Sequence, residues 1–292
     1  DDSSGIIIAD NEEILQEAVN IMSELFEEFF NSIGMALNAS KSELIVFRSG
    51  KKQKPLKLPR GQEESKVVKL LGLWIDNNYR FETHTQKVMQ KVRYKLANLS
   101  KVRPFLSDDK AKMSVESLVH SSITYMGILY LRLPSNQKKV QKLLNRASRL
   151  VLRADPLTHV VDMNRELYWL NSENMYRFLL LTTFRRLRYR NCRALISWDN
   201  VFVTQPTLYK LRSVHLRVQW ARITCHGRNS FIYQSTHLMN ELEISGALYT
   251  SDNHFKTAIK FILFRDFYLS LIHISEPTRL RRISYAVFCV KK

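Results

Sequence analysis

Residues 137–153 read QKKVQKLLNRASRLVLR, and this segment carries the clearest structural pattern in the chain. Its apolar residues recur every three or four positions, which predicts the buried stripe of an amphipathic helix: Val140, Leu143, Leu144, Ala147 and Val151. Its basic residues follow the same spacing on another face, and we call them the basic ridge: Lys139, Lys142, Arg146, Arg149 and Arg153. No acidic residue lies between Lys138 and Arg153. A solvated helix face normally mixes signs, so this row favours contact with phosphates; an ordinary solvated face is the alternative.

Two further helices are predicted before this segment. The first begins near Phe81 and is closed by Pro104, with Val88, Val92, Leu96 and Leu99 on its apolar face. It carries a second set of basic residues at intervals of four: Lys87, Lys91 and Lys95. The next helix begins after Ser107, where Asp108 and Asp109 suit the helix dipole, and is expected to run to about Leu133.

The overall charge indicates a polyanionic partner. The chain has 292 residues, a net charge of +18 and a pI near 9.9, while 45% hydrophobic residues favour a folded protein. Residues 1–47 carry a net charge of −9, which leaves +27 for the remainder. We therefore expect nucleic acid as the partner, with an acidic membrane surface as the second possibility. Three scattered cysteines do not suggest a disulfide framework or a zinc site.

Neither a membrane span nor secretion is expected. The longest uncharged run, Ser117 to Leu131, has 15 residues, whereas a spanning helix needs about 20. No signal peptide is recognisable, so the expected location is intracellular, in the cytoplasm or the nucleus. The chain opens on Asp1-Asp2 without an initiator Met, and we expect it to be the tail of a longer protein.

The first 80 residues predict a small α+β unit. An amphipathic helix is expected from Asn11 to Ser32, after a capping box at Asp10–Glu13 and before Gly34. Its apolar positions are Ile14, Ala18, Ile21, Leu25 and Phe29. Strands are expected at Ser4–Ala9, Glu43–Phe47 and Val67–Ile75, with a loop at Ser49–Gly61.

After Pro156 the pattern is again helical. Helices are expected over Met163–Leu170, from Ser172 onward and over Asn253–Tyr268, with an irregular stretch at Val201–Tyr233. Trp169 is expected in the core, because aromatics at helix junctions usually pack inward; a base-stacking role is the alternative. Basic residues crowd the end of the helix that begins at Ser172: Arg185, Arg186, Arg188, Arg190 and Arg193.

Several segments, in order, resemble a known family. They are Asp1-Asp2 before an apolar strand, GMALNASKSE at 34–43, LLGLWID at 70–76 and the basic helical region up to residue 153. This order resembles the reverse transcriptase of non-LTR (LINE-type, Jockey-like) retrotransposons, from the aspartate pair of its catalytic motif onward. Ser42 replaces the family's usual Thr, and Leu70-Leu71 replaces its Phe-Leu. The resemblance extends, more weakly, to about residue 265.

The resemblance implies a role for each matching residue. Asp1 and Asp2 would be the catalytic carboxylates that bind Mg²⁺, although the pattern of two acids alone favours two solvated residues at a chain end. Lys41 would lie near the incoming nucleotide, with a plain surface lysine as the alternative. Leu71, Gly72 and Leu73 would form the primer grip. The basic ridge and the lysines Lys87, Lys91 and Lys95 would contact an RNA template and a DNA primer.

The implied organisation is a partial polymerase palm at 1–80, a helical thumb at 81–155 and a C-terminal retroelement region at 156–269. Residues 270–292 resemble translated sequencing-adapter read-through and are expected to be an artefactual tail, with a strand–turn–strand as the alternative. The family's third metal aspartate and its fingers would precede Asp1, so we expect a fragment of an RNA-directed DNA polymerase that is inactive by itself and binds no cofactor tightly. A non-catalytic nucleic-acid-binding module and a non-functional remnant of a dead element are the alternatives.

Overall fold

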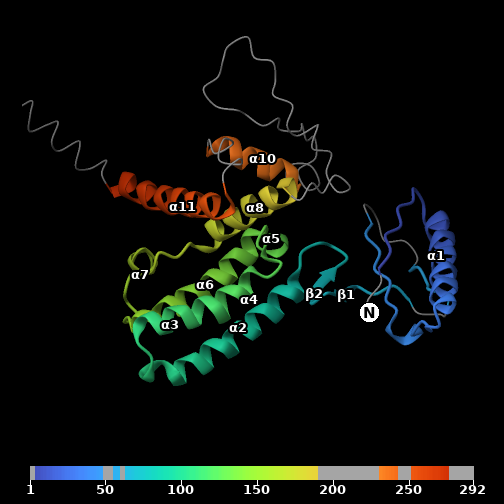
Figure 1. Cartoon of the computed structure of the whole chain (residues 1–292), viewed down its shortest axis with the longest axis horizontal. Helices are drawn as coiled ribbons and strands as arrows, with labels where there is room; N and C mark the ends of the chain where they lie inside the picture. The colour runs from blue at the N-terminus through green and yellow to red at the C-terminus, as the bar shows by residue number, and fades with distance from the viewer. Residues whose placement is uncertain (1–3, 49–54, 60–62, 190–229, 243–250, 276–292) are drawn as a thin grey trace, which may run out of the picture. The chain divides into compact units, whose positions relative to one another are not determined.

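The computed structural model describes residues 4–48, 55–59, 63–189, 230–242 and 251–275 (Figure 1). These residues are mostly helical and include one two-stranded antiparallel sheet, which is compatible with the expected α+β class. The chain divides into two compact units, Asp1–Val88 and Met89–Lys292, and the division falls inside one helix. We describe each unit by itself, and the expected palm, thumb and C-terminal regions stay predictions.

The first unit is built around α1, Glu12–Ser32, as the sequence predicts. Its N-cap is Asn11, one residue later than the first position of the expected capping box, and the Asn11 Oδ1 accepts a hydrogen bond from the Ile14 N–H at 2.8 Å. The helix ends at Ser32, where Ile33 caps it and Gly34 takes a φ of 76°. Local signals therefore placed both ends of this helix to within a residue.

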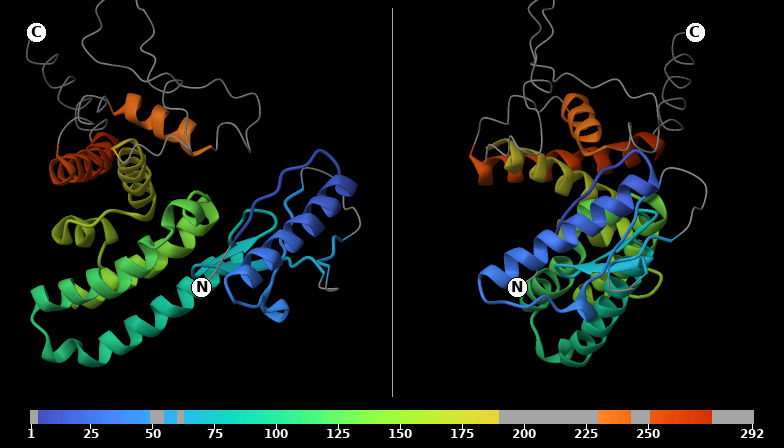
Figure 2. Two further views of the ribbon diagram at one scale, coloured as in Figure 1. Left: turned by 45° about the vertical axis from the view of Figure 1, so that its right-hand side comes forward. Right: turned by 90° about the vertical axis from the view of Figure 1, so that its right-hand side faces the viewer.

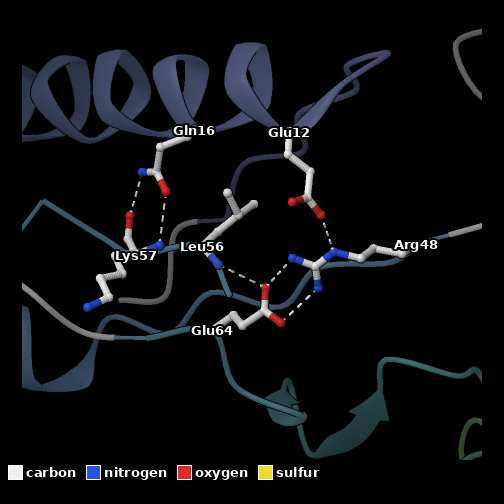
Figure 3. A network of polar contacts seen from close by, with 6 residues as sticks. All are labelled: Glu12, Gln16, Arg48, Leu56, Lys57 and Glu64. Carbon is white, nitrogen blue, oxygen red and sulfur yellow. Dashed lines mark hydrogen bonds and ion pairs between the residues drawn. The ribbon is translucent and has the colours of Figure 1, made fainter. Parts of the chain in front are cut away.

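A polar network fastens α1 to the segments that follow it (Figure 3). The Arg48 guanidinium donates to the Glu12 carboxylate at 2.6 Å and to both oxygens of the Glu64 carboxylate at 2.7 Å. The side chain of Gln16 exchanges two hydrogen bonds with the backbone of Lys57, at 2.6 and 3.0 Å. Because the Arg48 bonds favour the ionised carboxylate, the pKa of Glu64 lies below its ordinary value.

The one described sheet is a hairpin of β1, Val67–Leu70, and β2, Leu73–Asp76, paired Leu70 to Leu73 and Val67 to Asp76. The single strand expected over 67–75 is therefore wrong in form. Leu71 and Gly72 form the turn, with φ values of 46° and 83°. Two consecutive residues with positive φ match the twist of a two-residue hairpin turn. The apolar composition of residues 67–75 did not indicate that a turn divides them.

The other two expected strands are also corrected. Neither Ser4–Ala9 nor Glu43–Phe47 is a strand, and Ile6 and Ile8 are 89% and 93% exposed. Across the described part of the chain, the backbone of Glu43–Phe47 is joined to another segment by one hydrogen bond, from the Ser65 N–H to the Leu44 oxygen. An apolar run indicates burial, but a strand also needs a neighbouring backbone with which to form a ladder.

Helix α2, Glu82–Val102, begins in the first unit and continues into the second. The buried Asp76 carboxylate accepts from the N–H groups of Phe81 and Glu82 at 3.0 and 3.1 Å, and so fixes the start of α2 to the hairpin. The helix ends at Val102, and Pro104 lies in the short 3₁₀ turn η2, Arg103–Phe105. The predicted course of this helix is confirmed.

The next predicted helix is only partly correct. Helix α3, Asp108–Val115, begins at its expected cap, Ser107, but the chain then passes through a π-helical turn, η3, at Glu116–His120. Two short helices follow, α4 at Ser121–Thr124 and α5 at Gly127–Tyr130, separated by a reversal at Met126 with a φ of 51°. A single helix to Leu133 is therefore wrong, because tertiary packing overrides the local helical pattern here.

Helix α6, Pro134–Leu152, is the helix that the opening sequence predicts, and Pro134 starts it in the first turn. Helices α7, Val160–Leu167, and α8, Ser172–Tyr189, follow. The described part closes with α10, Phe231–Glu241, and α11, Asp252–Ser275. Figure 2 shows α10 and α11 beside α8, which contacts both.

The core of the second unit gathers apolar side chains from α2, α3, α6, α8 and α11. Trp169 is buried as predicted, and its Nε1 donates to the Glu116 Oε1 at 2.7 Å. Arg185 is also buried and forms an ion pair with Asp252 at 2.5 Å, whereas its neighbour Arg186 in the same basic cluster is exposed. Arg190 and Arg193 lie outside the described residues. Residues 276–292 of the expected tail also lie outside the described residues.

Candidate nucleic-acid interface

The basic ridge lies along one face of α6, opposite its buried stripe. Val140, Leu144, Ala147 and Val151 are each at most 3% exposed, and they fix which face of the helix is turned inward. On the other side the ridge residues Lys139, Lys142, Arg146 and Arg153 are exposed. The pattern of burial in α6 thus follows the sequence prediction closely.

Arg149 differs from the rest of the ridge. Its side chain is half-buried, and its Nε is fully buried without a hydrogen-bond partner among the described residues. Its guanidinium is therefore less accessible to a ligand than the ammonium groups of Lys139 and Lys142. Lys138, by contrast, is exposed and lies beside the ridge on the helical wheel. The helical spacing alone could have added it to the predicted set.

The exposed charges of the ridge are not neutralised. In the parts of the chain that the structure describes, no carboxylate forms an ion pair with Lys139, Lys142 or Arg146. On α8 and α11, by contrast, Arg177 pairs with Glu173 and Lys256 pairs with Asp252. A row of unpaired cations at helical spacing leaves each one able to meet an anionic oxygen.

Helix α6 is held in place by buried polar bonds at both ends. At its start, the Asn136 Nδ2 donates to the Tyr130 oxygen at 3.0 Å; near its end, the Ser148 Oγ donates to the Asn164 Oδ1 at 2.9 Å. The buried Arg103 guanidinium donates to the backbone oxygens of Leu150 and Val151 at 2.9 and 2.5 Å. These carbonyls lie in the last turn of α6, where the helix has no further N–H groups to donate to them. Arg103 therefore serves as the C-terminal cap of α6.

The basic residues of α2 are not equivalent to one another. Lys87 and Lys91 are exposed, as a phosphate ligand must be. Lys95 instead donates to the Leu118 backbone oxygen at 2.9 Å and to the Ser122 Oγ at 2.7 Å. Burial and the neighbouring Lys91 charge lower its pKa. These two hydrogen bonds join α2 to η3 and α4. The spacing of the lysines in the sequence did not predict them.

The expected primer-grip residues lie on the hairpin of the first unit. Leu71 and Gly72 are exposed in its turn, whereas Leu73 is buried, at 6% exposed. Lys41 ends a short 3₁₀ turn, η1 at Ala39–Lys41, and its side chain is exposed. The Asn38 side chain supports this turn by accepting from the Ser40 N–H at 3.1 Å. Their assigned roles stay predictions.

The expected catalytic carboxylates, Asp1 and Asp2, lie outside the described residues. Among the residues that are described, no group of three or more His, Cys, Asp and Glu side chains could hold a metal ion. The Mg²⁺ site therefore stays a prediction.

No helix within the described ranges is long and apolar enough to cross a membrane. Comparison of this chain with protein-family models, with curated proteins and with solved structures gave no match.

Proposed function

We propose that this chain binds the sugar–phosphate backbone of nucleic acids through the basic ridge of α6, with Lys91 of α2 contributing. The observation that carries the proposal is a row of exposed cations on α6, in a stretch without an acidic residue, that form no ion pair among the described residues: Lys138, Lys139, Lys142 and Arg146. Sequence-independent binding to a backbone requires cations at regular intervals on a firmly held surface, because phosphates also recur at regular intervals.

The resemblance to non-LTR reverse transcriptases supports a more specific form of this proposal. In that form the chain is a fragment of an RNA-directed DNA polymerase, the ridge belongs to its thumb, and the ligand is a template–primer duplex. The carboxylates Asp1 and Asp2 would bind Mg²⁺ in the intact enzyme. We expect this chain alone to give no primer extension on a primed RNA template with Mg²⁺ or Mn²⁺. Extension that is lost in Asp1→Ala would contradict the fragment proposal.

The test of binding is a triple reversal, Lys139→Glu, Lys142→Glu and Arg146→Glu. Wild-type protein should bind single-stranded and duplex nucleic acid with little sequence preference, and each duplex phosphate contact should contribute about 0.9 to the log–log salt slope. The reversal should lower that slope by roughly 2–3 and weaken binding equally for all sequences, as measured by fluorescence anisotropy from low to moderate salt. The helix itself should stay folded, because exposed substitutions usually change stability by about 0.5 kcal/mol or less.

The matched control reverses three exposed cations on separate elements: Lys66→Glu before β1, Lys110→Glu in α3 and Arg186→Glu in α8. Arg185 is unsuitable for this purpose because it is buried and paired with Asp252. Both triple variants change the net charge equally, so the control should retain most of the affinity and the salt slope. Equal loss in the two variants would show that binding depends on bulk charge and that the ridge is not a binding face.

A further inference from the structure

Helix α1 exposes an apolar face that no described residue of the first unit covers. The apolar residues that the sequence placed on one face lie within about 80° of one another around the helix axis, and we call them the exposed stripe: Ile14, Ala18, Ile21, Leu25 and Phe29. Ile14, Ile21, Leu25 and Phe29 are 50–58% exposed. The sequence predicted this face as the buried one, so the structure reverses the expectation.

The inward face of α1 is a different one, and its contacts fix the rotation of the helix. Val19 is the buried residue of α1, and Glu12 and Gln16 bind Arg48 and Lys57 on that side (Figure 3). On a helical wheel these inward residues lie roughly opposite the exposed stripe. The helix cannot bury the stripe by rotating without breaking this network.

A row of carboxylates runs beside the exposed stripe. It consists of four exposed glutamates that lie within about 60° of one another, and we call it the acidic row: Glu13, Glu17, Glu24 and Glu28. No cation forms an ion pair with these four glutamates within the residues that the structure describes. Helix α1 contains no basic residue, so the row has one sign along its whole length.

The charge of the row restricts what can cover the stripe. Nucleic acid and anionic lipid surfaces are repelled by it. A second copy of α1 is also disfavoured, because antiparallel pairing brings one acidic row against the other, and parallel pairing needs the face that is already turned inward. The complementary ligand is a helix that carries an apolar stripe flanked by lysines or arginines.

We infer that α1 is a docking surface for a basic amphipathic helix of a protein partner, which covers the exposed stripe and pairs with the acidic row. This surface is separate from the basic ridge, so the inference does not depend on the proposed nucleic-acid binding. In this kind of recognition an amphipathic helix lays its apolar face on an apolar surface of its partner. The acidic row would give specificity by favouring a helix with basic flanking residues.

The probe is a synthetic peptide of about 20 residues with leucines at helical spacing and a flanking lysine row, and its control is a scrambled peptide of the same composition. The full chain carries a net charge of +18, so the net charge of the whole chain repels a cationic peptide, and the scrambled peptide measures any unspecific attraction to the acidic residues 1–47. Fluorescence anisotropy should show saturable 1:1 binding of the amphipathic peptide, weakened by salt, and much weaker binding of the scrambled one.

Three variants locate the contact. Glu17→Lys, Glu24→Lys and Glu28→Lys together should weaken peptide binding about tenfold, because each exposed ion pair that is lost weakens binding by roughly twofold and like charges then repel. The pair Ile21→Ser and Leu25→Ser should weaken it similarly by removing apolar contacts, while both changes are on exposed positions. The matched control combines Glu43→Lys, Asp109→Lys and Glu166→Lys, three exposed acids outside α1. It changes the net charge equally and should leave binding unchanged.

Two results with the peptides would overturn the inference: no saturable binding at millimolar concentration, or equal binding of the scrambled peptide. An equal loss of peptide affinity in the acidic-row variant and the matched charge control would also overturn it. So would a dimer of the chain that Leu25→Ser dissociates. Nucleic-acid binding by the same preparations should be retained in the α1 variants. Failure of peptide binding with intact nucleic-acid binding would therefore reject this inference alone.

Discussion

Arg103 offers a direct test of how the second unit holds the helix that carries the basic ridge. This side chain is 6% exposed, and its guanidinium donates to the backbone oxygens of Leu106, Leu150 and Val151 at 2.8, 2.9 and 2.5 Å. It also forms an ion pair with Asp108. One residue thus joins the end of α2 to the start of α3 and the end of α6. The substitution Arg103→Met keeps most of the apolar stem and removes every donor.

The expected loss can be worked out from these contacts. A hydrogen bond from a charged donor contributes about 1.5–3 kcal/mol, and Arg103→Met leaves the last-turn carbonyls of α6 without their partners. A buried acceptor left without its partner costs about 1–3 kcal/mol, so the two carbonyls of Leu150 and Val151 give an expected loss of about 2–6 kcal/mol in the free energy of unfolding. For a unit of this size, that corresponds to a fall in Tm of roughly 10 °C.

The assay is urea and thermal unfolding followed by circular dichroism at 222 nm. Arg93→Met is the matched control, because Arg93 is an exposed arginine on α2 and its loss should change stability by about 0.5 kcal/mol or less. Arg103→Lys should recover only part of the lost free energy of unfolding, since one ammonium cannot donate to all of the carbonyls that the planar guanidinium binds. If Arg103→Met and Arg93→Met unfold alike, Arg103 is not the C-terminal cap of α6 and the reasoning is refuted.

Two other predictions concern His120 and the hairpin turn. Burial lowers the pKa of His120 to about 4, below its unfolded value of about 6.5, so its contribution to stability is present at neutral pH and is lost as the pH falls from 6.5 towards 4. Wild type should therefore lose about 2 kcal/mol more than His120→Phe between pH 7 and pH 5 in urea unfolding, and identical losses would contradict the burial of a neutral imidazole. Leu71 holds a φ of 46° in the turn, which asparagine tolerates better than leucine, so Leu71→Asn should stabilise the first unit by about 0.5–1 kcal/mol. Leu71→Ala keeps the unfavourable backbone and serves as the control; equal unfolding of the two variants would show that the turn is not strained.

The helices were predictable because their signals are local. Residues three and four apart meet on one face whatever the rest of the chain does, so the apolar periodicity alone predicted α1, α2 and α6. Ser107 marked the start of α3, and Gly34 marked the end of α1. The rows of cations on α2 and α6 were predictable for the same reason, whereas the roles of Asp1, Asp2 and Lys41 rest on a resemblance and stay predictions.

The strands were not predictable in the same way, because a strand is defined by its partner. The run at Ser4–Ala9 has the composition of a buried strand, yet Ile6 and Ile8 are exposed, and β1 pairs with β2 only because Leu71 and Gly72 accept a tight turn. The chain carries no local sign of whether a second backbone will lie alongside.

For α1, α2 and α6, residues within one or two turns of the chain were enough to predict the helix, its ends and its row of like charge. The folded arrangement then set which of those residues are free to bind a ligand. It turned Val19 of α1 inward and left the exposed stripe outside, tied Lys95 to η3 and α4, and buried Arg103 and Arg185 as internal ion-pair partners. The physical reason is that burial depends on contacts between segments far apart in the chain, and those contacts, unlike helical periodicity, leave no regular spacing in the sequence.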